Sequence, residues 1–204
     1  SSSFPTSIKS VGVFFISMAA ELLTLTCDAV VVVDQSFVPP EGEVRLDTQV
    51  GVAPFFAGAQ TFTPLLSGQL EGFDFWIQAA GGAPLTADLL LRVETTTAQG
   101  VPSGISLGSV MLPASFLSQQ SGVYKHIAMD GQNISLVGGE RYAAVFEAVP
   151  FISGGNSAYD FRGYSASQLG CNFAYDGGQG IYSEDGKTWK VYAAADFDYV
   201  FRVY

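Results

Sequence analysis

Basic side chains are scarce in this chain. Nine Lys and Arg residues stand against nineteen Asp and Glu residues in 204 positions, which gives a formal net charge of -10 at pH 7. No cluster of Lys and Arg interrupts this acidic background. An acidic surface repels the phosphate backbone, so we expect no nucleic acid among the partners of this protein.

Histidine and cysteine are almost absent. His126 is the sole histidine, so the sequence offers no Ser-His-Asp set, no Cys-His set and no zinc-ligand spacing. No two of the carboxylates stand out as a pair for glycoside hydrolysis. We therefore expect a protein that is not an enzyme and has no cofactor, with structural calcium as the one alternative. Cys27 and Cys171 could form a disulfide in a secreted protein, stay reduced in a cytosolic one, or be separated when a leader is removed.

A hydrophobic run long enough for a transmembrane helix is also lacking, because such a helix needs about 20 apolar residues. Residues 11–25 are mostly apolar, follow Lys9 and precede small residues. This order indicates a signal peptide with cleavage after Ala29, although Glu21 lies inside the run. Two alternatives stay open: a buried strand or helix, or an arm that packs on a neighbouring subunit. We divide the chain into residues 1–29, a signal peptide or N-terminal apolar arm, and residues 30–204, a single domain.

Alternation of apolar and polar residues is what the sequence has in abundance. Residues 60–78 predict a strand, a short Ser-Gly turn and a second strand, in which Phe73, Phe75 and Ile77 share one face. We expect further strands at residues 30–37, 87–94, 109–112, 123–129, 141–149, 181–183, 189–192 and 197–204.

No amphipathic helix stands out, and turn signals recur about every ten residues. We expect an all-β fold, namely a jelly-roll-like, two-sheet antiparallel β-sandwich, with a closed barrel as the alternative. Residues 41–58, 100–108 and 154–180 are expected to be loops.

The hairpin at residues 181–192 resembles a shortened Asp-box, the turn motif of sialidases and other secreted β-proteins. In this motif Asp185 can accept hydrogen bonds from turn amides, Gly186 can adopt a positive φ, and Trp189 can pack beneath the turn. We interpret these three residues as structural.

Aromatic residues crowd the expected loop at 154–180 and its end. Rings beside Asn, Gln and Asp suit a sugar, since a flat apolar surface meets the ring and polar groups meet the hydroxyls. The expected ligand-binding residues are Tyr159, Tyr164, Tyr175 and Tyr182. Calcium needs six to eight oxygen ligands, and the acidic residues of this region are Asp160, Asp176, Glu184 and Asp185.

Several segments together resemble the secreted bacterial choice-of-anchor domains, relatives of the PEP-CTERM surface proteins. They are VVDQSF at 32–37, QTFTP at 60–64, SGQLEGFDFWI at 67–77, GVPSGISLGSV at 100–110, ISLVGGERYAAVF at 134–146, YSEDGKTW at 182–189 and FDYVFRVY at 197–204. The resemblance implies a secreted or surface-displayed β-sandwich without a known catalytic activity, whose leader ends just before the 32–37 segment.

These observations favour a secreted, non-catalytic structural or interaction domain at the cell surface or in the extracellular matrix. Its partners would be copies of itself or other extracellular proteins, and an N-terminal strand could mediate self-assembly. The alternative is a carbohydrate-binding module that uses the aromatic residues of 154–182 to hold a polysaccharide.

Overall fold

The structure is a computed structural model that describes residues 32–38, 46–50, 56–79, 85–117, 122–151, 159–165, 175–192 and 197–204. Contacts divide the chain into two compact units, Ser1–Val30 and Val31–Tyr204, and every described residue belongs to the second. The expected leader or arm at residues 1–29 lies outside the described residues, as do Cys27 and Cys171.

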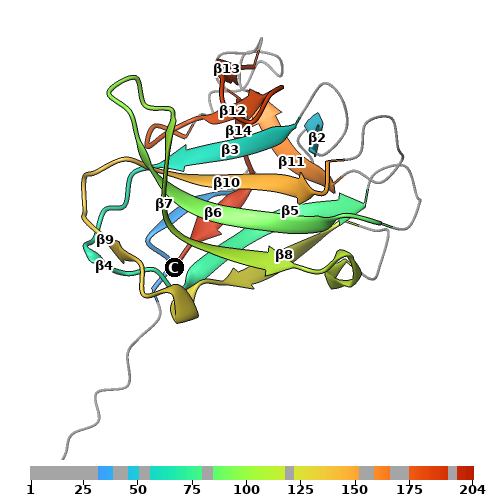
Figure 1. The fold of residues 1–204 in the computed structure, drawn as a ribbon. Coiled ribbons are helices and arrows are strands. Elements are labelled where there is room, and N and C mark those ends of the chain that lie inside the picture. Colours follow the sequence, from blue (N-terminus) through green and yellow to red (C-terminus); the bar gives the residue numbers. More distant parts are fainter. Residues whose placement is uncertain are drawn as a thin grey trace, which may run out of the picture. The chain divides into compact units, whose positions relative to one another are not determined.

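The described residues form two antiparallel sheets that pack face to face (Figure 1). The expected all-β, two-sheet sandwich is confirmed. The seven-stranded sheet contains β1 (Gln35–Phe37), β2 (Leu46–Val50), β5 (Gly72–Ala79), β8 (Val123–Ala128), β11 (Tyr159–Ser165), β14 (Phe197–Tyr199) and β15 (Phe201–Val203). The six-stranded sheet has the order β13 (Trp189–Val191), β12 (Gly180–Ser183), β3 (Ala57–Phe62), β10 (Tyr142–Val149), β6 (Asp88–Thr96) and β7 (Pro102–Leu112).

Four short elements complete the described fold. β4 (Gly68–Gln69) and β9 (Ser135–Leu136) pair at one end of the sandwich, and the two 3-10 helices are η2 (Ala114–Phe116) and η3 (Asp130–Gln132). Within the described ranges no helix is long and apolar enough to cross a membrane.

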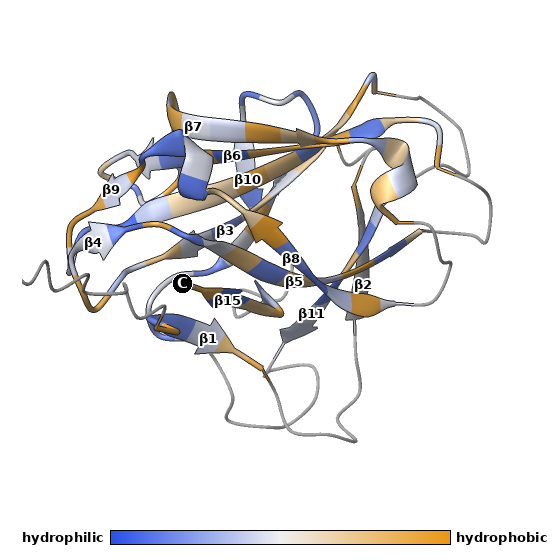
Figure 2. Cartoon of the chain, turned by 90° about the horizontal axis from the view of Figure 1, so that it is seen from below, coloured by the Kyte–Doolittle hydropathy of each residue, from blue (hydrophilic) through white to orange (hydrophobic). Residues whose placement is uncertain are grey.

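Aromatic side chains from both sheets fill the space between them. Phe146 of β10 stacks on Phe161 of β11 with ring centroids 4.0 Å apart, and Phe75 and Tyr199 meet Phe146 edge to face. All four are fully buried. Successive strand residues point to opposite faces, so hydrophobic and hydrophilic bands alternate along the strands in Figure 2.

A buried polar link joins the two sheets across this core. The side-chain amide of Gln60, on β3, donates to a carboxylate oxygen of Asp198, on β14, over 2.9 Å. The Gln60 side-chain oxygen accepts from the backbone N–H of Tyr199 at 2.8 Å, and Asp198 also accepts from the N–H of Tyr175. Gln60 and Asp198 are almost wholly buried, so each depends on the other for hydrogen bonding.

The expected hairpin at residues 60–78 is wrong in its pairing. Phe73, Phe75 and Ile77 do share a buried face, but β3 and β5 belong to different sheets. Pro64 and β4 lie between them, and the chain crosses from one sheet to the other. Phe62 and Phe73 meet across the core instead, with ring centroids 5.5 Å apart.

The three expected loops are also partly wrong. Residues 41–58 contain β2, residues 100–108 contain most of β7, and residues 154–180 contain β11. Each of these strands is antiparallel to its neighbours: β7 pairs with β6, and β11 pairs with β2, β5 and β14. Partner strands stabilise them despite their Gly, Ser and Thr content, because strand preference depends strongly on context.

Candidate functional site

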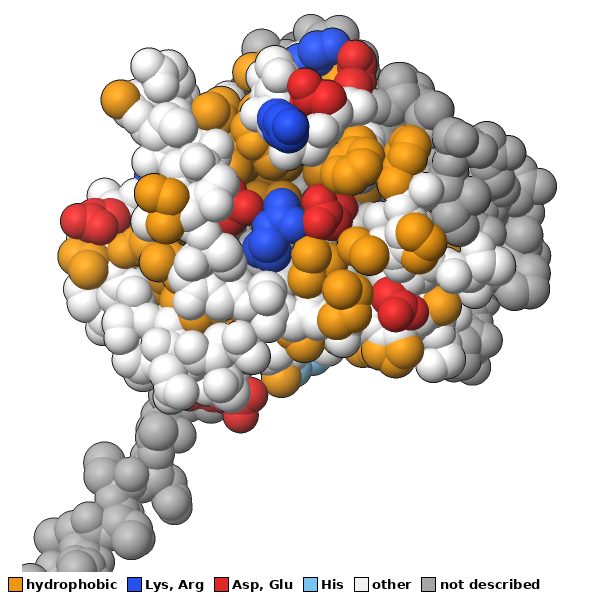
Figure 3. Space-filling model, viewed as in Figure 1, with side chains coloured by type: hydrophobic (Ala, Val, Ile, Leu, Met, Phe, Trp, Pro, Cys, Tyr) orange, Lys and Arg blue, Asp and Glu red, His pale blue; other side chains and the backbone are white. Residues whose placement is uncertain are grey.

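A groove lies on the outer face of the six-stranded sheet, the face turned away from the core. Figure 3 shows the hollow, with a basic side chain between two acidic ones. Its volume is about 380 Å3, within the range of ligand pockets. The lining residues are Arg92, Glu94, Pro102, Ser103, Gly104, Gly186, Lys187 and Trp189.

Strand register explains why these residues meet. Arg92 of β6 lies opposite Val145 of β10, which lies opposite Ala59 of β3, which in turn lies opposite Ile181 of β12. Cross-strand partners share a face, so this row forms the floor of the groove. Short floor side chains between long side chains on β6 and β13 leave the hollow.

The floor is apolar and fully covered. Ala59, Ala143, Val145 and Ile181 form a second hydrophobic cluster, separate from the main core, with Trp189 packed against it. Each of the four has no exposed surface. The cluster therefore lies beneath the side chains that line the groove and supports them from below.

One wall of the groove is an ion network on β6 and β10. Nε of Arg92 donates to Glu94 at 3.0 Å, and Nη1 of Arg92 donates to Glu147. The second oxygen of Glu94 accepts from the backbone N–H of Gly104 at 2.8 Å. Burial lowers the pKa of Arg92, but the ion pairs with Glu147 and Glu94 outweigh it and raise this pKa above its usual value. Arg92 is therefore a permanent cation with its geometry fixed.

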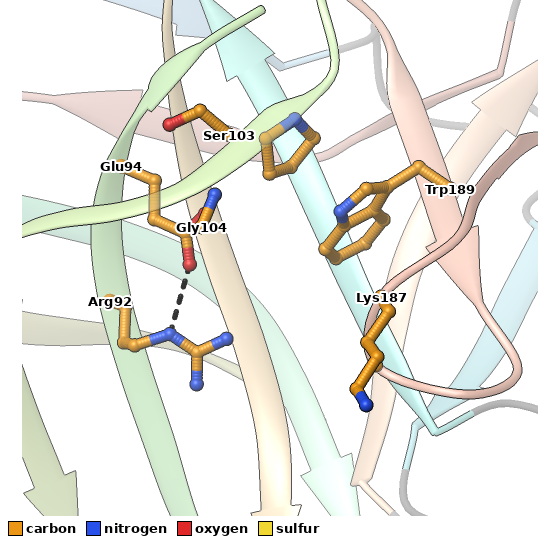
Figure 4. A pocket seen from close by; sticks show the side chains of 8 residues that line it. Arg92, Glu94, Ser103, Gly104, Lys187 and Trp189 are labelled. Carbon is orange, nitrogen blue, oxygen red and sulfur yellow. Dashed lines mark hydrogen bonds and ion pairs between the residues drawn. The ribbon is translucent and has the colours of Figure 1, made fainter.

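The opposite wall comes from the β12–β13 hairpin. Figure 4 shows Trp189 and Lys187 reaching into the groove from one side and Arg92 and Glu94 from the other. Trp189 is partly exposed, so the indole presents part of its surface to the groove.

The turn before Trp189 is held by one carboxylate. Asp185 accepts hydrogen bonds from the N–H of Lys187 at 2.8 Å and from the N–H and hydroxyl of Thr188 at 2.6 and 2.8 Å. Gly186 has φ 72°, which favours glycine. The roles predicted for Asp185 and Gly186, as a turn acceptor and a positive-φ residue, are confirmed, whereas Trp189 packs against the floor cluster. The hairpin thereby places three groove residues, Gly186, Lys187 and Trp189.

Removing the Asp185 carboxylate should loosen this wall. Backbone hydrogen bonds from Thr188 and Lys187 lower the pKa of Asp185 well below its usual value. A lowered pKa means that the stabilisation is present above the unfolded value of about 3.9 and is lost as pH falls below it. We expect Asp185→Ala to increase hydrogen exchange at the amides of Lys187 and Thr188 at pH 7. Glu184→Ala, one residue away, is the control, and unchanged exchange in Asp185→Ala would contradict this role.

The tyrosines predicted to bind a ligand are not at the groove. Tyr159 and Tyr164 lie buried within the sandwich, where neither ring offers a face to a ligand, and the Tyr159 hydroxyl donates to the carbonyl of Ala87. Tyr175 is partly buried and donates to Gln35 at 3.0 Å, and burial raises the pKa of Tyr175 to about 12. Tyr182 is partly exposed and packs on Tyr192 with ring centroids 4.7 Å apart. It neighbours groove-floor residue Ile181, so it faces the opposite side of β12.

The acidic residues considered for calcium do not gather. Within the described ranges, no group of three or more His, Cys, Asp or Glu side chains could hold a metal ion. Glu184 pairs with Lys190 at 2.6 Å, and Asp185 serves its own turn. Structural calcium stays a prediction.

His126 lies on the outer face of the other sheet. Its Nδ1 is 2.8 Å from Asp74, which also accepts a hydrogen bond from the Tyr204 hydroxyl at 2.6 Å. The His126 side chain is about half exposed. His126 is therefore a surface residue whose hydrogen bonding is satisfied by Asp74.

Sequence reasoning missed Arg92, Glu94 and Lys187 as groove residues. One signal was present: Arg92 and Glu94 occupy the polar positions of a strand whose apolar positions, Leu89 and Leu91, are core. The pairing of Arg92 with Glu147, 55 residues away, becomes visible only when the strand register is known.

Comparison with known proteins does not assign this chain to a family. No protein-family model, curated protein or solved structure matches the chain. The resemblance to choice-of-anchor surface proteins stays an expectation.

Proposed function

We propose that this protein is a secreted, non-catalytic binding domain that holds a saccharide in the groove of the six-stranded sheet. The observation that carries the proposal is the partly exposed ring of Trp189 across from the polar wall of Arg92 and Glu94 (Figure 4). Secretion is motivated by the sequence of residues 1–29. The proposed saccharide site therefore consists of residues other than the four tyrosines expected from the sequence.

The chemistry of the two walls suits a polyhydroxylated ligand. An indole face packs against the C–H surface of a sugar ring, and Arg92, Lys187 and Ser103 can donate hydrogen bonds to its hydroxyls. Arg92 is fixed by its two carboxylate partners, so its side chain loses little conformational freedom when a ligand binds.

Charge balance favours a neutral saccharide. The two cations Arg92 and Lys187 face the two carboxylates of Glu94 and Glu147, so the formal charges cancel at the groove, whereas the whole chain carries -10. A strongly anionic ligand would meet this negative surrounding field.

The same geometry favours binding without turnover. Glycoside hydrolysis needs one carboxyl group that releases a proton and a second that acts as base or nucleophile. Glu94 and Glu147 are both bound to Arg92, and Glu94 also holds the Gly104 amide. Their contacts serve the wall of the groove.

Truncating the indole should weaken binding. We expect Trp189→Ala to weaken saccharide affinity at least about tenfold, since buried aromatic anchors dominate binding energy. The measurement is retention on insoluble neutral polysaccharides, followed by calorimetry with the fragment that binds. Tyr124→Ala, an exposed aromatic on the other sheet, is the matched control.

Two further variants separate binding from folding. Trp189 also packs on the floor cluster, so Trp189→Phe keeps an aromatic ring there, and Lys187→Ala removes a polar contact from an exposed position. Both should weaken binding while circular dichroism stays unchanged. Retention by Trp189→Ala equal to that of the unmodified protein would refute the proposal, as would no retention of the unmodified protein on any neutral polysaccharide.

A further inference from the structure

β7 is the outermost strand of the six-stranded sheet (Figure 2). It is 11 residues long, and it lies within residues 95–124, which contain no Asp, Glu, Lys or Arg. Natural edge strands usually carry charges or are covered, because their free N–H and C=O groups can pair with another chain. This edge has no charged side chain.

Large apolar side chains are exposed along β7. Ile105 is 64% exposed, Leu107 37% and Met111 46%. A bulge near Leu107 interrupts the first half of the strand, but residues 108–112 keep a regular register with Leu89–Val93 of β6. The regular half therefore presents a straight free edge with apolar side chains beside it.

A side chain from η3 forms a hydrogen bond to that edge. The backbone N–H of Ser109 donates to the side-chain oxygen of Gln132, on η3, over 3.3 Å. This N–H thus points away from β6 and toward the free edge. The bond is long for an N–H donor to oxygen, and a neighbouring strand could replace it with a backbone carbonyl.

We propose that β7 pairs antiparallel with β7 of a second copy of this chain, centred on Ser109. Antiparallel strands exchange both hydrogen bonds at alternate residues, and the outward N–H makes Ser109 such a residue. This register brings Leu107 of one copy close to Met111 of the other, so each copy covers the other's apolar side chains. The contact is self-complementary, as a two-fold interface requires.

The distribution of charge favours a second copy of this chain as the partner of β7. Two chains of net charge -10 repel each other wherever their acidic surfaces meet. The stretch without charges around β7 is where two copies can approach without placing like charges side by side.

Sedimentation of the full chain across a range of concentrations tests the proposal. We expect a monomer–dimer equilibrium that Met111→Lys shifts at least tenfold toward monomer. Gln132→Ala should shift it toward dimer, because it frees the Ser109 amide. Leu65→Lys, at a side chain 76% exposed outside β7, is the matched control and should leave the equilibrium unchanged.

A cross-link tests the register. A hydrogen-bonded antiparallel pair has Cα atoms about 5.5 Å apart, which a disulfide can span. With Cys27 and Cys171 replaced by Ser, Ser109→Cys should form a covalent dimer under mild oxidation and Ser106→Cys should not. A monomer at every concentration, or equal cross-linking at both positions, would overturn the proposal. Trp189→Ala should leave the dimer intact, which separates this inference from the proposed saccharide site.

Discussion

Replacing Phe146 with alanine is expected to lower the free energy of unfolding by about 3–5 kcal/mol. Phe146 has no exposed surface and touches rings from both sheets, stacking on Phe161 at 4.0 Å and meeting Tyr199 at 4.8 Å. Truncation leaves a cavity that rigid neighbouring strands cannot fill, and it also removes the ring–ring contacts. This is the largest effect we expect from any single side chain.

Urea unfolding followed by circular dichroism measures this loss. Tyr124→Ala removes a ring that is 43% exposed on the outer face of the other sheet, and it should cost well under about 1.5 kcal/mol. Equal losses in the two variants would mean that the two sheets do not pack through Phe146. Phe146→Leu should recover part of the stability, since it refills part of the cavity.

Replacing Asp198 with alanine is expected to cost about 2–4 kcal/mol, because one buried and one partly buried donor lose their carboxylate acceptor. These are the side-chain amide of Gln60 and the backbone N–H of Tyr175. Asp198 is only 2% exposed, so water does not readily replace the carboxylate. The cost comes from polar groups left unpaired in the interior.

A double-mutant cycle assigns this cost to the link between the sheets. Gln60→Ala and Asp198→Ala should each destabilise, and the double variant should lose clearly less than the sum, because each single change breaks the same hydrogen bond and leaves the other residue unpaired. Glu184→Ala, which removes an exposed ion pair with Lys190, should change the stability by less than about 0.5 kcal/mol. Additive losses at Gln60 and Asp198 would show that the two residues act separately.

Local pattern predicts those parts of the fold whose interactions are local. Strands β5, β6 and β10 were predicted because their inward residues are large and apolar and their neighbours are polar. The turn at Asp185 was predicted because each of its partners lies within three residues. In both cases the chain segment itself contains the evidence.

Long-range pairing explains what the sequence could not predict. β7 and β11 contain glycine and serine, and neighbouring strands make them part of a sheet. β7 pairs with β6, and β11 pairs with β2, β5 and β14. β3 and β5 follow each other in the chain yet join different sheets. The groove depends on the same long-range register, since its floor combines β3, β10 and β12. Alternation marks which side chains turn outward, but it does not say which of them become neighbours.

The pairing of β1 with β15 governs how the described domain responds to pulling. These two strands are antiparallel, with Gln35 opposite Val203 and Phe37 opposite Phe201, and the N–H of Asp34 bonds to the carbonyl of Val203. Residues 34 and 204 therefore lie at the same end of this strand pair. Tension applied between residues 34 and 204 loads the hydrogen bonds between β1 and β15 one after another, in the unzipping geometry. A force along the strands, in the shear geometry, would load all of these hydrogen bonds together. A domain attached at only one of these two residues carries no force across the β1–β15 pair. A domain stretched between residues 34 and 204 opens first at β1, the edge strand of the seven-stranded sheet.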